Sequence, residues 1–304
     1  MADKAAAHLK SLEKHRRNIF GGAFVLIQYS ISNLFYKMKT ITFQQKQIAY
    51  HKKGEGNCLV LLHGFPMDSR VWKDFIVSLS EIFCVIAPDL PGLGKSDMLA
   101  ERHDMGLMAD VLAAILEAEQ INKCVLAGHS MGGYVGMAFA DKYAKKLAGL
   151  ALLHSHASAD DAQGRENRNQ AILKIHDDKK AFLTNFVQSL FDEKFAAKNP
   201  EAVHFITDIT LSQEKQAVVA AMAGMRERES HIELLSKLKV PVLFVLGKSD
   251  SRMPPIKIMA QAALPAHGEL LMLEGVGHMG FLESPLIVME VLKAFVLRCS
   301  LLTG

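Results

Sequence analysis

Ser130 has the residue type and the neighbours of a catalytic nucleophile. It lies at the centre of residues 128–132, whose sequence GHSMG matches the pattern G-x-S-x-G. The short apolar run at 123–127 predicts a buried strand, and residues 133–140 predict a closely packed helix. A sharp turn between a strand and a helix holds a serine in a strained conformation, with its hydroxyl group at the end of the sheet. This context favours a nucleophile over a glycine-rich loop that merely contains a serine.

Asp250 and His278 are candidates for the base that a nucleophilic serine needs and the acid that orients this base. They follow Ser130 in the order serine, aspartate, histidine, and each comes after an apolar run that predicts a buried strand. Because parallel strands end at one edge of a sheet, we expect the imidazole to lie between hydroxyl and carboxylate. A turn aspartate and an ordinary loop histidine, one of 13, are the simpler alternative. Asp160 or Asp161 is a rival acid that we rank below Asp250.

Acyl transfer also needs hydrogen-bond donors for the oxyanion that develops in the transition state. The apolar run at 58–62 predicts a strand, and His63 and Gly64 follow it. Gly64 allows the chain to turn inward, so the backbone N–H of Phe65 is the first expected donor. The N–H of Met131, at the start of the helix after the serine, is the second, and the helix dipole supports it. For His63 we favour a role in bracing this loop over a catalytic one.

Five segments in the same order resemble the α/β-hydrolase superfamily, in its branch with a serine nucleophile. The resemblance extends from about Thr40 to the C-terminus, interrupted by a variable middle. The turn at 89–97 implies a shaping role for Asp89 and Ser96, without chemistry. The segments are HGFP at 63–66 with Trp72, DLPGLGKSD at 89–97, GHSMGG at 128–133, G-x-x-D-x-x-x-P at 247–254, and GH with ESP at 277–285.

The resemblance implies a catalytic triad of Ser130, Asp250 and His278, with Phe65 and Met131 as oxyanion donors. It also implies a helical cap inserted after the sixth strand of the core. A serine nucleophile argues against the epoxide hydrolases and haloalkane dehalogenases of the same superfamily, because both need an aspartate at this position.

The rhythm of the sequence independently predicts an α/β fold with a doubly wound, mostly parallel sheet of eight strands that begins with antiparallel strands. Helical stretches separate most of the apolar runs, and ligands on such sheets bind beyond the carboxyl ends of the strands. We therefore divide the chain into a core at 38–154 and 236–304 and a cap at 155–235. Strands are expected near 40–43, 46–51, 58–62, 83–88, 123–128, 148–153, 240–246 and 269–274.

The cap region is helical in character and is interpreted as a lid over Ser130. We expect helices at 165–175, 179–191, 200–211 and 212–228. Its apolar side chains recur at nearly helical spacing, which favours packing within the lid for each one and an apolar pocket roof for the group. His154 and His156 follow a strand, and pocket lining and a polar lid hinge are both open interpretations. Candidates for pocket lining are His63, Gly64, His129, His154 and Met279.

Composition predicts a folded enzyme without large charged partners. The 304 residues are 50% apolar, and 35 basic against 32 acidic residues give a net charge of +3 with no long basic run. We therefore expect a small-molecule substrate and no nucleic-acid partner. The oligomeric state stays open. Cys58, Cys84 and Cys124 lie in or beside predicted strands and are expected to be buried free thiols. Neither C-x-x-C nor H-E-x-x-H occurs, and we expect no metal or cofactor.

Residues 1–37 differ from the rest of the chain and are predicted to be an appendage that the catalytic core does not need. The apolar stretch at 19–27 is too short to cross a membrane. It follows Arg16 and Arg17 as in a signal peptide, but the long charged leader and the reduced cysteines argue against one. We therefore expect a cytoplasmic protein, and we expect a chain that begins at Met38 to fold and retain activity.

The expected reaction is cleavage of a carboxylic ester or lactone of a small, largely apolar substrate through an acyl-enzyme. The same triad serves thioesterases, C–C hydrolases, enol-lactone hydrolases and cofactor-free perhydrolases, and HGFP occurs in the last two groups. A ligand receptor that keeps the triad and a non-catalytic binding module on this scaffold are further alternatives. The intact triad makes the binding module the least favourable of these. The cap determines specificity, so the sequence does not name the substrate.

Overall fold

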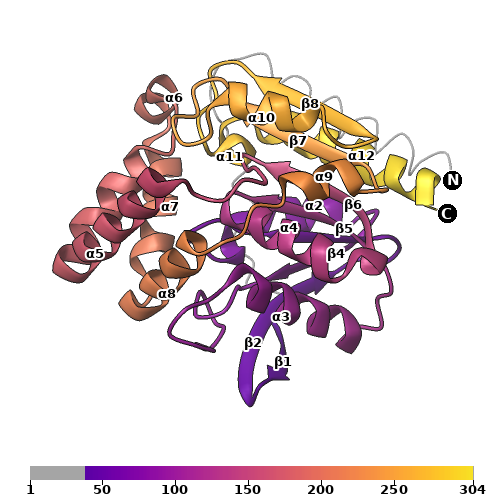
Figure 1. The fold of residues 1–304 in the computed structure, drawn as a ribbon, viewed down its shortest axis with the longest axis horizontal. Coiled ribbons are helices and arrows are strands. Elements are labelled where there is room, and N and C mark those ends of the chain that lie inside the picture. The colour runs from indigo at the N-terminus through magenta and orange to yellow at the C-terminus, as the bar shows by residue number, and fades with distance from the viewer. Residues whose placement is uncertain (1–37, 304) are drawn as a thin grey trace, which may run out of the picture. The chain divides into compact units, whose positions relative to one another are not determined.

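The computed structural model describes residues 38–303, so the predicted appendage at 1–37 lies outside the described residues. Eight strands form one sheet in the order β1-β2-β4-β3-β5-β6-β7-β8 (Figure 1). The β1–β2 and β2–β4 pairs are antiparallel, and all other pairs are parallel, which confirms the predicted sheet. The strands are β1 (Lys39–Phe43), β2 (Lys46–Lys53), β3 (Cys58–Leu62), β4 (Cys84–Pro88), β5 (Cys124–His129), β6 (Leu147–Leu153), β7 (Val242–Gly247) and β8 (Gly268–Leu273).

The central strands form because they are apolar on both sides. All residues of β3, β4, β5, β6 and β7 are buried, as parallel strands between two helical layers must be. Alternate residues of β3 belong to opposite cores: Leu59 and Leu61 to one, Val60 and Leu62 to the other. The sheet therefore separates two hydrophobic cores.

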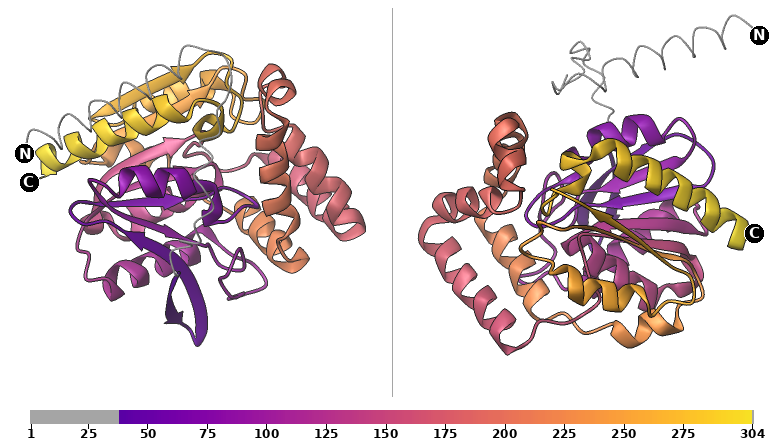
Figure 2. Two further views of the ribbon diagram at one scale, coloured as in Figure 1. Left: turned by 180° about the vertical axis from the view of Figure 1, so that it is seen from behind. Right: turned by 90° about the horizontal axis from the view of Figure 1, so that it is seen from above.

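Helices cover both faces of this sheet (Figures 1 and 2). The core on one face includes buried residues of α3 (Met105–Ala118), α4 (Met131–Lys142), α9 (Ile232–Lys237) and α10 (Pro255–Ala262). The core on the other face includes α2 (Lys73–Leu79), α11 (Gly280–Glu283) and α12 (Pro285–Thr303). Short 3₁₀ helices lie at Ser69–Trp72 and Ala144–Lys146. None of the helices within residues 38–303 is both long enough and apolar enough to cross a membrane.

The cap consists of the first four of the five helices between β6 and β7, and these four lie together at one side of the sheet (Figures 1 and 2). They are α5 (Ala162–Gln188), α6 (Glu193–Lys198), α7 (Pro200–Leu211) and α8 (Lys215–Arg226). These helices follow β6, the sixth strand, where the sequence predicts that the cap is inserted. A backbone hydrogen bond also connects the cap to the core: the N–H of His103, just before α3, donates to the carbonyl of Ala220 in α8 (3.1 Å).

One detail of the cap agrees with the sequence prediction and two differ. The break expected between the helices at 165–175 and 179–191 is present, because α5 consists of two helices joined at the non-helical residue Asp178 (φ −139°, ψ 91°). The Asp178 carboxylate accepts from the N–H of Ala181 (2.9 Å), so it caps a new helical start inside α5. The helix expected from 212 begins at Lys215, because Ser212–Glu214 form the turn after α7. Helix α6 was not predicted, and Asp192 caps it by accepting from two backbone N–H groups.

Candidate active site

Ser130 lies at the turn between β5 and α4, where the sequence predicts a nucleophile. Its backbone has φ 50° and ψ −113°, a conformation that residues with side chains rarely adopt. The turn needs glycine beside it, because a Cβ atom on Gly128 would lie 2.3 Å from the carbonyl oxygen of Gly132. The N–H of Ser130 donates to the carbonyl of Leu153 in the neighbouring strand (2.9 Å). The strained serine is therefore fixed at the carboxyl end of β5.

Asp250 and His278 lie in the loops after β7 and β8, and a hydrogen bond joins them. Nδ1 of His278 lies 2.8 Å from Oδ2 of Asp250, and both residues are buried. A carboxylate only accepts hydrogen bonds, so Nδ1 carries the proton and Nε2 is left free to receive one. Oδ1 of Asp250 accepts from the N–H groups of Arg252 (2.9 Å) and Met253 (3.1 Å). The pair has the orientation that a general base and its acid require.

Asp250 stays ionised despite its burial. Burial alone would raise the pKa of this carboxyl group, but the charge of His278 and the hydrogen bonds from His154 and His278 hold the pKa well below its usual range. The acid therefore remains negative at any pH near neutrality. A permanent negative charge can orient the imidazole and stabilise its protonated form.

The loops that carry Ser130 and His278 meet through His129. Nε2–H of His129 donates to the carbonyl oxygen of His278 (2.8 Å), and the two rings lie 4.9 Å apart. Among the hydrogen bonds within residues 38–303, none joins the Ser130 hydroxyl group to His278. Catalytic hydrogen bonds are often long before substrate binds. The structure thus brings acid and base into contact, and His129 joins the loop of His278 to the turn that carries the serine.

The two expected oxyanion donors lie beside the same turn. Phe65 and Met131 are both buried, and neither of their N–H groups donates to another residue between 38 and 303. A buried N–H without a partner is rare in proteins. The N–H of Met131 is free because it belongs to the first turn of α4. Both groups are therefore available to a developing oxyanion.

Both ring nitrogens of His63 lie within hydrogen-bond distance of backbone groups, which braces the loop after β3. Its Nε2 accepts from the N–H of Leu90 (2.9 Å), so Nδ1 carries the proton and lies 3.0 Å from the carbonyl of Gly64. Burial lowers the pKa of His63, which keeps its ring neutral. Asp89 accepts from the N–H groups of Ser69 and Lys95, both at 2.8 Å. These contacts agree with the bracing and shaping roles expected for His63 and Asp89.

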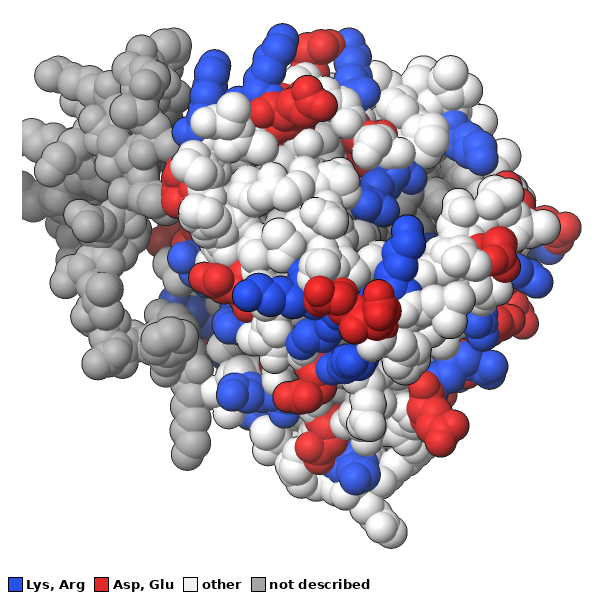
Figure 3. Space-filling model, turned by 90° about the vertical axis from the view of Figure 1, so that its left-hand side faces the viewer, with Lys and Arg blue, Asp and Glu red and all other residues white. Residues whose placement is uncertain are grey.

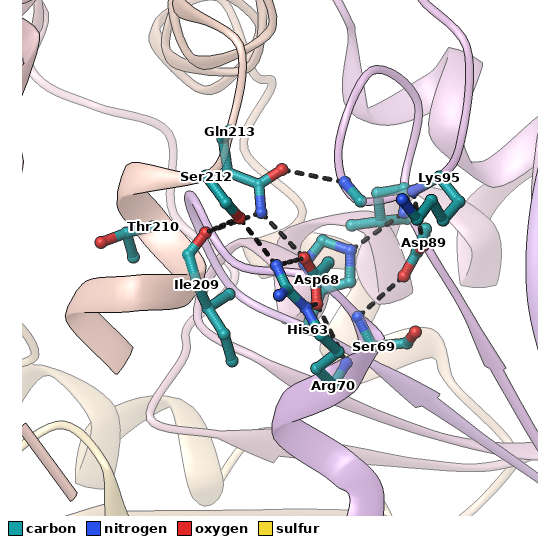
Figure 4. A network of polar contacts seen from close by, with 12 residues as sticks. His63, Asp68, Ser69, Arg70, Asp89, Lys95, Ile209, Thr210, Ser212 and Gln213 are labelled. Atoms are coloured by element: carbon teal, nitrogen blue, oxygen red, sulfur yellow. Dashed lines mark hydrogen bonds and ion pairs between the residues drawn. The ribbon is translucent and has the colours of Figure 1, made fainter. Parts of the chain in front are cut away.

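A buried polar network ties the cap to this region (Figure 4). The Asp68 carboxylate accepts from Nε and Nη2 of Arg70 (2.8 and 2.6 Å) and from Nε2 of Gln213 (2.8 Å). Oε1 of Gln213 accepts from the N–H of Gly94 (2.9 Å), and Ser212 accepts from Arg70 (2.7 Å). Because Gln213 and Ser212 lie between α7 and α8, this Asp68–Gln213 network fixes the cap beside the oxyanion loop.

His154 occupies a place that the sequence did not reveal. Its Nδ1 lies 3.0 Å from the same Oδ2 of Asp250 that His278 contacts. The three side chains have the ligand types of a zinc site. Ligand atoms around tetrahedral zinc, however, stand about 3.3 Å apart when each lies near 2.0 Å from the metal. The two contacts here are those of hydrogen bonds, so the arrangement fits proton donors on a carboxylate.

The remaining predicted positions are placed as follows. Asp160 forms ion pairs with Arg168 and Arg228, and Asp161 caps α5. Neither makes a hydrogen bond to His278, so both rival acids are engaged in structural contacts instead.

A Cβ atom on Gly64 would lie 2.5 Å from Nδ1 of His129, so glycine is needed there. Met279 is buried and its N–H donates to Glu283. Cys58, Cys84 and Cys124 are buried free thiols, as expected, and Cys299 is buried as well.

Sequence reasoning missed Gln213, Glu283 and the role of His154. Glu283 accepts from the N–H groups of Asp192, Gly277 and Met279, all at 2.9 Å, and thereby holds the loop before His278. Its place in the motif at 277–285 was the available signal. For His154, the signal is the strand order, because β6 lies between β5 and β7. No local pattern marks Gln213.

The comparisons with known proteins agree with this geometry. The family model described as alpha/beta hydrolase fold matches residues 57–285. Over 258 residues the chain is 26% identical to the pimeloyl-[acyl-carrier protein] methyl ester esterase of Aeromonas hydrophila, covering 82% of this chain and 99% of that protein. It is 28% identical to the dihydrolipoyllysine-residue acetyltransferase component of the acetoin cleaving system of Pseudomonas putida, covering 80% of this chain but only 64% of that protein.

A solved structure gives a further similarity. A thermophilic esterase from Thermogutta terrifontis, described with malate bound, superposes with a TM-score of 0.82 at 32% identity, covering 86% of this chain and 99% of the other. The family match covers most of the sequence, and the sheet order, the serine turn and the acid–base pair are those of that fold. The chain belongs to the α/β-hydrolase family.

Proposed function

We propose that this protein is a serine esterase that cleaves a carboxylic ester or lactone of a small, largely apolar substrate through an acyl-enzyme. One observation carries the proposal. The turn that carries the strained Ser130 is joined through His129 to the loop of His278, whose Nδ1 is held 2.8 Å from a buried carboxylate. The esterases to which the chain is similar, from Aeromonas hydrophila and Thermogutta terrifontis, support the same bond type by their names.

Acylation begins with attack of the Ser130 hydroxyl oxygen on the substrate carbonyl carbon. His278 takes the hydroxyl proton at Nε2, and Asp250 stabilises the resulting imidazolium through Nδ1–H. The free N–H groups of Phe65 and Met131 bind the oxyanion. His278 then gives its proton to the leaving alcohol, and the acyl group stays on Ser130.

Deacylation repeats these steps with water as the nucleophile. His278 removes a proton from water, which attacks the acyl carbon, and the same two N–H groups bind the second oxyanion. The protonated imidazole then returns a proton to Ser130, and the carboxylic acid leaves. Every step uses side chains and backbone groups of this chain alone.

The preference for an apolar acyl group follows from the aromatic side chains near the oxyanion loop. Phe186 of α5 packs edge-on against Phe65 (centroids 5.7 Å apart) and stacks with Phe182 (6.1 Å). The guanidinium carbon of Arg252 lies over the ring of Phe186, 4.3 Å from the ring centroid. On the cap side, the outer surface mixes acidic and basic residues without a continuous area of one sign (Figure 3). An ester with an uncharged acyl group can pack against the rings of Phe65, Phe182 and Phe186.

The test is hydrolysis of p-nitrophenyl esters of increasing acyl length, beside a lactone and a thioester. Ser130→Ala should lower kcat by about 10⁴- to 10⁶-fold and leave the circular dichroism spectrum unchanged. Ser236→Ala, in an exposed serine of α9, is the matched control and should retain full activity. Near-normal ester turnover by Ser130→Ala would refute the proposal, and faster thioester than ester cleavage would refute the substrate class.

A further inference from the structure

His154 is a buried imidazole that the proposed mechanism does not use. Its side chain is 1% exposed, and its Nδ1 lies 3.0 Å from Oδ2 of Asp250, the oxygen that also accepts from His278 at 2.8 Å. A serine hydrolase needs only one imidazole on its carboxylate. The second one therefore requires an explanation.

The fold holds His154 firmly between nucleophile and acid. Strand β6 lies between β5 and β7, and the N–H of His154 donates to Val245 in β7 (2.7 Å). Its backbone has φ 48°, which costs energy for a residue other than glycine and is typical of functional sites. A Cβ atom on Gly280 would lie only 2.3 Å from Nε2 of the ring. The ring is thus confined.

We propose that His154 is a positioning residue that shares the Asp250 carboxylate with His278 and thereby weakens the hold of this carboxylate on the Nδ1 proton of the catalytic imidazole. This inference rests on the proposed function. His154 acts on the reaction through Asp250, to which its side chain is hydrogen-bonded.

The direction of the effect follows from the charges around the carboxylate. His129, His154 and His278 are the imidazoles packed around Asp250, and the Arg252 guanidinium is a cation that interacts with it. Burial lowers the pKa of His154, so its ring is a neutral donor. Each donor on Oδ2 disperses part of the negative charge. When His154 no longer donates, Asp250 attracts the proton on His278 more strongly, and the inactive imidazolium persists to higher pH.

The experiment compares His154→Leu with His154→Asn, whose side-chain amide can donate from nearly the position of Nδ1. The pH dependence of kcat/KM is measured with p-nitrophenyl butyrate, together with the rate of labelling by a fluorophosphonate, which needs no ester turnover. In His154→Leu the acid limb of both profiles should move up by about one pH unit, with full activity regained at alkaline pH and KM unchanged. In His154→Asn it should move by less than about 0.3 unit.

Three outcomes would overturn the inference alone: an unmoved acid limb in His154→Leu, equal movement in both variants, or an equal loss at every pH. The last would indicate a merely structural role. If His154→Leu does not fold, His154→Gly replaces it in the comparison with His154→Asn. Both glycine and asparagine tolerate a positive φ, and glycine has no side-chain donor. Wild-type protein that neither hydrolyses esters nor reacts with the probe would instead refute the proposed function.

Discussion

Gln213 links the cap to the core, and its replacement by methionine should destabilise the protein measurably. The side chain is buried and makes three hydrogen bonds: it accepts from Gly94 N–H (2.9 Å) and donates to Asp68 (2.8 Å) and to the carbonyl of Ile209 (2.9 Å). Methionine has nearly the same shape and forms none of them. The substitution therefore removes polar contacts without opening a large cavity.

The expected loss can be worked out from the partners that remain. Asp68 keeps its two contacts with Arg70, so its charge is not left unpaired. The Gly94 N–H loses its acceptor, at a cost of about 1–3 kcal/mol, and one hydrogen bond to a charged group is lost as well. Together these give about 2.5–6 kcal/mol in the free energy of unfolding, or roughly 5–24 °C in Tm for a domain of this size.

Urea unfolding followed by circular dichroism measures this loss. Gln216→Met is the matched control, because Gln216 lies one turn further along and is exposed; it should change stability by less than about 0.5 kcal/mol. The activity of Gln213→Met should also fall, because Asp68 directly follows the oxyanion loop. If the two variants unfold at the same urea concentration, the Asp68–Gln213 network does not stabilise the cap.

Three further predictions follow from single contacts. Gly64→Ala should lower kcat at least about tenfold, because the new Cβ atom would lie 2.5 Å from Nδ1 of His129. Gly106→Ala is the control and should be neutral, because its Cβ atom would meet nothing closer than 3.9 Å. Equal activity of the two variants would contradict this. Asp250→Asn should lower kcat by about 10⁴-fold and Asp160→Asn by less than tenfold; the reverse order would make Asp160 the acid. Burial opposes ionisation of Glu119, but Lys39, Lys52 and Tyr50 lower its pKa from 4.5 to about 2. Its stabilisation is therefore present above pH 4.5 and lost as the pH falls toward 2, so the difference in unfolding free energy between wild type and Glu119→Gln should shrink with acidification; a constant difference would argue against this ion-pair cluster.

The sheet was predictable from the sequence because its central strands are buried on both faces and are therefore continuously apolar. Such runs as Cys58–Leu62 and Val242–Gly247 stand out against the helical stretches between them. The serine turn was predictable for a related reason: only small residues fit at 128 and 132, and they leave a readable pattern. Local constraints of this kind are visible in local sequence.

The parts that sequence reasoning missed depend on contacts between distant segments. Gln213 finds its partners 145 and 119 residues away. The contact of His154 with Asp250 follows from the order of three strands in the sheet. Each of these is fixed by tertiary packing.

The most direct test of the serine nucleophile is to locate the adduct of a fluorophosphonate by peptide mass spectrometry. We expect one adduct per chain, on Ser130, no labelling of Ser130→Ala, and labelling of His278→Gln that is at least about 100-fold slower than in wild type. An adduct on another residue, or a Ser130→Ala variant that labels at the wild-type rate, would contradict the account.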